Sequence, residues 1–77
     1  MASNTLNPEW VKGYHDTYLR RRSIESVQVW EMHEGDKIVA WQVLASTGQR
    51  MYVMARVWGK ENKDEALRIQ LELVESL

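Results

Sequence analysis

Apolar and polar residues alternate along the middle of the chain in three blocks, and turn sequences separate the blocks. The alternation has a period of two residues, which is typical of β-strands. Two segments rich in glycine and polar residues interrupt it, Glu34-Gly35-Asp36 and Thr47-Gly48-Gln49. Turns this short join neighbouring strands, so the pattern predicts an antiparallel meander. Its strands are expected near Ser26–His33, Lys37–Ser46 and Arg50–Trp58.

Neither face of this predicted sheet consists mainly of polar residues. One set of alternate positions is mostly small and aliphatic: Val27, Val29, Val39, Trp41, Val43, Ala45, Met51, Val53, Ala55 and Val57. The other set should meet water, yet it holds Gln28, Trp30, Met32, Ile38, Gln42, Leu44, Tyr52, Met54, Arg56 and Trp58. The assignment assumes three-residue turns, and a change of one residue would exchange the faces of a strand. A second face rich in Trp, Tyr, Met and Arg is typical of a surface that binds a partner.

A helix is predicted on each side of the meander. Asn7-Pro8-Glu9 is a favourable helix start, and apolar residues at helical spacing lead from there to the arginines at 20–22. The second helix is expected to begin with a capping box from Asn62 to Glu65. Its apolar residues span a wide arc, which predicts a well-buried helix. The fold class is therefore α+β, in the order α-β-β-β-α.

Size and composition narrow the functional classes. The 77 residues form one domain, 1–77, in which 1–6 are expected to be disordered. Ten basic and eleven acidic residues argue against a broadly cationic nucleic-acid binder. The chain lacks cysteine, a signal-peptide pattern and a long apolar run, so we expect a soluble, cytoplasmic protein without a membrane partner.

Catalytic chemistry has little support in the sequence. His15 and His33 each stand beside a carboxylate, but neighbours along a helix or strand point apart. No nucleophile motif, phosphate-binding glycine loop or zinc spacing is present. We therefore expect no enzyme activity, no cofactor and no metal site.

The predicted order of elements resembles the double-stranded-RNA-binding domain over nearly the whole chain. Tyr14 lies in the first helix, and Gly59 leads through 62–66 into the second. Of the family's lysine pattern, Lys63 and Ala66 match, whereas Asp64 and Leu67 replace lysines. Glu34-Gly35-Asp36 stands in place of the family's Gly-Pro-x-His turn. The resemblance implies binding of double-stranded RNA or DNA through a basic helix edge, formed by Arg20, Arg21, Arg22, Lys60, Lys63 and Arg68.

A second resemblance is to the sheet-reading DNA-binding domains of the plant AP2 and integrase N-terminal type. Those domains read DNA through arginines and tryptophans on an open sheet face, and the matching groups are Arg50, Arg56, Trp30 and Trp58. The apolar companions of these groups are poor neighbours for phosphates: Met32, Ile38, Leu44 and Met54.

The residue chemistry favours a small, non-catalytic binding module that acts through the open sheet face. Its partner is expected to be another protein or a second copy in a homodimer, because Trp, Tyr, Met and Arg are typical of protein interfaces. The candidate contact residues are Trp30, Met32, Tyr52, Met54, Arg56 and Trp58. Nucleic-acid binding and a small, for example viral, inhibitor of a larger host protein are the alternatives. The deciding question is whether the first helix lies beside the second or crosses this face.

Overall fold

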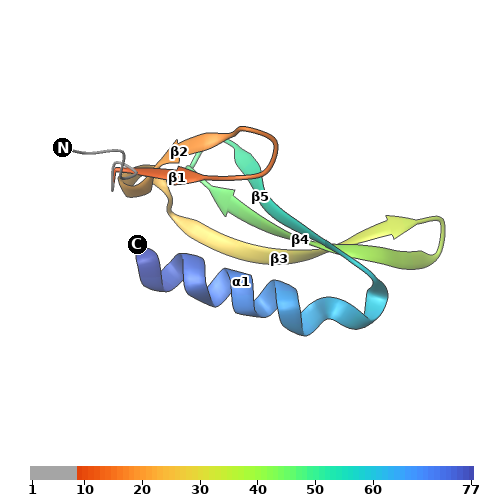
Figure 1. The fold of residues 1–77 in the computed structure, drawn as a ribbon. Coiled ribbons are helices and arrows are strands. Elements are labelled where there is room, and N and C mark those ends of the chain that lie inside the picture. The colour runs from red at the N-terminus through yellow and green to blue at the C-terminus, as the bar shows by residue number, and fades with distance from the viewer. Residues whose placement is uncertain (1–8) are drawn as a thin grey trace.

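A computed structural model describes residues 9–77 of the chain and shows two antiparallel sheets and one long helix (Figure 1). The predictions of disorder at 1–6 and of a helix start at Asn7 and Pro8 fall outside these residues. No helix within 9–77 is long and apolar enough to cross a membrane. In chain order the elements are β1 Trp10–Lys12, β2 Tyr18–Arg20, the 3-10 turn η1 Arg21–Ser23, β3 Ser26–Glu34, β4 Lys37–Ser46, β5 Met51–Trp58, the 3-10 turn η2 Lys60–Asn62 and α1 Lys63–Ser76.

The prediction of an N-terminal helix is wrong, because a β-hairpin occupies its place. Val11 of β1 pairs with Leu19 of β2, and the chain reverses between Gly13 and Thr17. The reversal needs positive φ angles at His15 and Asp16, 54° and 60°, in a region where these residue types are enriched. The order α-β-β-β-α is therefore wrong too. The first helix, which the resemblance to the double-stranded-RNA-binding domain requires, is replaced by β1 and β2.

The three-stranded meander is confirmed in order β3-β4-β5, with strand bounds within one residue of those expected. Alternation along β4 turns Trp41, Val43 and Ala45 toward α1. Trp41 holds the turn η2, which precedes α1, against the sheet, because its indole Nε1 donates a hydrogen bond to the carbonyl oxygen of Lys60 at 3.0 Å. One face of the sheet therefore forms the core, and α1 covers it.

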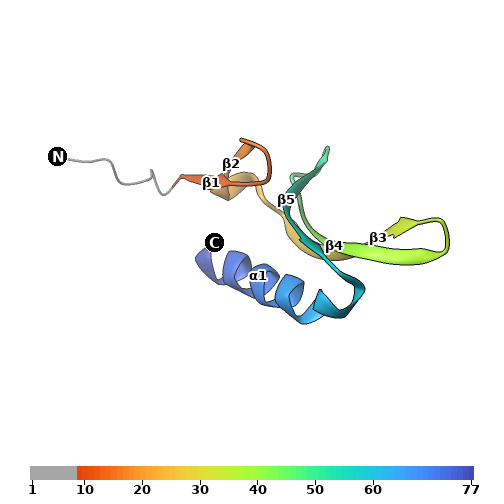
Figure 2. The ribbon, with the colours of Figure 1, turned by 45° about the vertical axis from the view of Figure 1, so that its right-hand side comes forward.

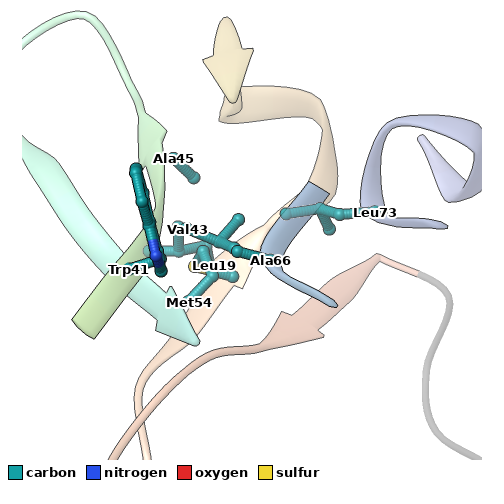
Figure 3. Packing of buried hydrophobic residues seen from close by; sticks show 7 residues of the cluster. All are labelled: Leu19, Trp41, Val43, Ala45, Met54, Ala66 and Leu73. Carbon is teal, nitrogen blue, oxygen red and sulfur yellow. The ribbon is translucent and has the colours of Figure 1, made fainter. Parts of the chain in front are cut away.

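The N-terminal hairpin lies on the same face of the sheet as α1. Leu19, 7 % exposed, belongs to one buried cluster with Ala66 and Leu73 of the helix. Figure 3 shows the side chains of this cluster. The end of β2 also reaches the end of α1, where Arg21 donates to the carbonyl oxygen of Ser76. The hairpin thus closes one end of the core, and no helix or strand within residues 9–77 covers the opposite face of the sheet.

A register shift in β5 changes which of its side chains join the core. Val43 pairs with Ala55 but Leu44 pairs with Val53, so Met54 is an extra residue in β5, as in a β-bulge. Beyond the shift the faces of β5 exchange, and Tyr52 pairs with Ala45 on the α1 side. The predicted face assignment is therefore correct for the second half of β5 and wrong for its first half.

Two expectations for the second helix also need correction. The side chain of Asn62 makes no capping hydrogen bond and donates instead to the carbonyl oxygen of Trp58 at 2.8 Å. Glu65 binds Arg68 rather than the helix start. The helix is not well buried, since only Ala66 and Leu73 are buried along its length.

Candidate partner-binding surface

The uncovered face of the meander carries six large or polar side chains in adjacent rows, which we call the open face: Gln28, Trp30, Met32, Gln42, Arg56 and Trp58. Strand pairing places Trp30 opposite Gln42, and Gln42 opposite Arg56. Directly paired residues share a face, so these three side chains form one row across the sheet. The face extends toward the β3–β4 turn, which projects beyond α1 (Figure 2).

The two tryptophans of the open face are largely exposed to solvent. Trp30 is 52 % exposed and Trp58 is 56 % exposed. The indole Nε1 of Trp30 donates to the side-chain oxygen of Gln28, which fixes the ring along its own strand. Two exposed indoles on one face of a small sheet leave a substantial apolar area in water, as at binding surfaces.

Among the six described residues of the open face, Arg56 alone is charged, and three neighbours fix its position. Its guanidinium carbon lies 5.1 Å from the ring centroid of Tyr14 and 5.7 Å from that of Trp58, within cation–π range. Hydrogen bonding orients the Gln42 amide so that its oxygen accepts from Arg56 Nε at 3.2 Å and from Nη2 at 2.8 Å. Among residues 9–77, no carboxylate forms an ion pair with it. The result is a positioned cation whose charge no described side chain neutralises.

The structure brings together four of the six predicted contact residues. Trp30, Met32, Arg56 and Trp58 share the open face, whereas Tyr52 and Met54 lie on the core side. Met54 is only 8 % exposed, and its sulfur would be 3.0 Å from a Cβ added at Gly13. The physical cause is the register shift, which turns the first half of β5 over.

Sequence reasoning missed two residues of the open face, Gln28 and Gln42, and also Tyr14, which contacts the open face from the hairpin. Gln28 and Gln42 already stood in the correct alternate set and could have been chosen for their hydrogen-bonding side chains. Tyr14 had no usable signal, because it reaches Arg56 only through the hairpin, where its amide donates to the carbonyl oxygen of Val53 at 3.1 Å.

The predicted basic edge is not a continuous site. Arg20 forms an ion pair with Glu9 at 2.7 Å, and Arg22 lies 3.9 Å from the same carboxylate. Arg21 binds the end of α1. These groups belong to the hairpin end of the molecule, where an open hollow is lined by Glu9, Arg21, Arg22 and Leu77.

The helix end of that predicted edge is engaged in other contacts. Arg68 binds Glu65 and Glu72 along α1, which lowers the pKa of the Glu65 carboxyl from its ordinary value and raises that of the guanidinium. Lys63 Nζ lies 5.2 Å from the ring centroid of Trp41. Lys60 lies in the turn η2 before the helix.

The histidines lie apart. His15 is in the hairpin turn against Tyr14, while His33 Nε2 lies 2.7 Å from Glu31 Oε1 near the β3–β4 turn. Within residues 9–77 no three His, Cys, Asp or Glu side chains gather as metal ligands would.

Comparisons with protein-family models, with curated proteins and with solved structures found no significant match. The surface described above therefore carries the functional argument by itself.

Proposed function

We propose that this chain is a non-catalytic protein-binding module whose open face takes a protein segment with an acidic side chain. The observation that carries the proposal is Arg56, a guanidinium held between Tyr14 and Trp58 without a carboxylate partner among residues 9–77. A cation fixed in this way loses little further entropy on binding, and its bond to a carboxylate is charge-assisted.

The residues around Arg56 favour a protein partner. Trp, Tyr and Arg dominate binding hot spots, and Met is enriched at interfaces. Trp30 ends the row that it forms with Gln42 and Arg56, and Trp58 follows Arg56 two residues along β5. Apolar contacts to these exposed indoles would accompany the charged contact to Arg56. The surface is a sheet face rather than a deep pocket, which suits a macromolecular segment better than a small ligand.

Nucleic-acid binding through the same face is the second candidate, and one observation favours it. Three of the four apolar residues that weigh against phosphate contact are removed from the exposed surface. Met54 and Ile38 pack against the core, and Leu44 is 8 % exposed. Gln and Arg are side chains that read base edges. The acidic residues Glu34 and Asp36 at the neighbouring β3–β4 turn oppose a polyanion, so we place this candidate second.

Selection from a displayed library of random peptides tests the proposal. We expect enriched peptides to combine Asp or Glu with apolar residues and to lose binding to Arg56→Gln and Trp58→Ala. Arg50→Gln is the matched control, because Arg50 is an exposed arginine in the β4–β5 turn. Peptides that bind Arg56→Gln as tightly as the unaltered protein would refute the proposed role of Arg56. A low-salt shift of duplex DNA or RNA that Arg56→Gln abolishes would favour the second candidate instead.

A further inference from the structure

A stripe of exposed apolar side chains runs along one flank of α1. Leu67, Leu71 and Val74 are 40 %, 56 % and 47 % exposed. They recur at intervals of four and three residues, so they lie above one another on the helix surface. This α1 flank is separate from the buried line of Ala66 and Leu73, and it is also separate from the ion pairs of Arg68.

The α1 flank lies on the β3 side of the helix. Gln70 stands between the buried line and the flank at about 100° per residue, and its Nε2 donates to the carbonyl oxygen of Val27 in β3 at 2.9 Å. That contact fixes the rotation of the helix relative to the sheet. The flank therefore points past β3, beyond the edge of the sheet.

β3 is an edge strand on that same side. The sheet order is β3-β4-β5, and no other strand within residues 9–77 pairs with the outer side of β3. In an antiparallel ladder alternate residues direct their amide and carbonyl groups outward. Because the carbonyl of Val27 points outward to Gln70, those of Val29 and Glu31 do so as well. An unpaired strand edge and an apolar helix flank thus lie side by side.

We propose that a second copy of this chain binds here, in a two-fold dimer that pairs β3 with β3 and packs α1 against α1. One two-fold rotation makes both contacts antiparallel and self-complementary, which is the commonest symmetry of homodimers. It covers the exposed apolar side chains of both helices, and it satisfies the outward backbone groups that an edge strand leaves unpaired.

Charge complementarity supports the second copy as the occupant. Arg68 and Glu75 lie three residues before and four residues after Leu71, and on the same side of the α1 flank at about 100° per residue. In an antiparallel helix pair centred on Leu71, Arg68 of one copy therefore lies opposite Glu75 of the other. Arg68 would bind this carboxylate through guanidinium N–H groups beyond those that it gives to Glu65 and Glu72. The pairing is favourable twice, once on each side of the axis.

The dimer would join two open faces on one six-stranded sheet, with both helices on the opposite side. It extends the proposed function but does not rest on it, because the open face takes no part in the contact. Self-association through the open face makes a different prediction, and variants on the two faces separate the two arrangements.

Sedimentation velocity of the full chain, over a range of concentrations, is the first test. We expect a concentration-dependent dimer whose dissociation constant rises at least about tenfold in Leu71→Glu, because this change places two charges at the axis. Leu71 is 56 % exposed, so the variant should fold, and its circular dichroism should match that of the unaltered protein. Trp58→Glu is the matched control, with the same new charge at a side chain of equal exposure on the open face.

Cysteine cross-linking provides the second test, because the chain contains no cysteine. Under mild oxidation Leu71→Cys should form a disulfide-linked dimer, whereas Trp58→Cys should remain monomeric on a denaturing gel. A chain that sediments only as a monomer would overturn the proposal. So would a dimer that persists in Leu71→Glu and is lost in Trp58→Glu.

Discussion

Leu19→Ala should detach the N-terminal hairpin from the core. Leu19 is the buried residue of the hairpin, with 7 % of its surface exposed. Replacing a buried leucine by alanine costs about 2–5 kcal/mol, and we expect about 2–3 kcal/mol here, because a short hairpin at the end of the core can shift to fill the space. The whole domain is stabilised by about 4–12 kcal/mol at the usual value per residue. The loss is therefore a large part of the stability of the whole domain, and it falls on the contact that attaches the hairpin.

Amide hydrogen exchange measures this detachment directly. The amide of Tyr14 donates to the carbonyl oxygen of Val53 and is protected only while the hairpin is docked. A loss of about 2–3 kcal/mol should lower its protection roughly 30- to 150-fold, with a smaller change in the centre of β4. Tyr18→Ala is the control, because Tyr18 is 48 % exposed and alternates with Leu19 on β2. Equal protection of the Tyr14 amide in both variants would refute the anchoring role of Leu19.

Three further substitutions test individual contacts. Trp41→Phe removes the donor to the Lys60 carbonyl oxygen and should cost about 1–3 kcal/mol in urea unfolding; an unchanged free energy of unfolding would contradict this. Gly59→Ala places a Cβ at a φ of 104° and should cost about 1–3 kcal/mol; an unchanged Tm would contradict this. Because Arg68 lowers the pKa of Glu65, their pair stabilises the fold at neutral pH and is lost as the pH falls through that pKa. Glu65→Gln should thus lower Tm at neutral pH but not in strong acid, and an equal effect at both would contradict it.

The meander was predictable because its local signals agree with its tertiary environment. Glycine-containing turns bound each strand, and the alternation along β3 and β4 places Val29 and Val43 in the core as expected. The tryptophans of the open face follow from the same alternation. The alternation of residues therefore predicts most of the candidate surface.

The N-terminal hairpin was not predictable from the same kind of signal. Val11, Tyr14 and Tyr18 recur at helical spacing, and Asn7-Pro8-Glu9 favours a helix start. The observed strands are three residues long, too short for a period of two to show. These strands are stabilised by the contact of Leu19 with distant parts of the chain. A contact of this kind cannot be predicted from the local sequence pattern.

The register shift in β5 determines which chemistry the open face presents. Without it, strict alternation would place Tyr52 and Met54 beside Arg56 and make the face predominantly apolar. With it, Met54 enters the core against Gly13, and the carbonyl of Val53 binds Tyr14 at the edge of the sheet. Tyr14 can then lie against Arg56. The same bulge thus removes a methionine from the open face and positions Tyr14, one of the two aromatic rings that contact Arg56. The proposed site for an acidic partner therefore depends on one extra residue in β5.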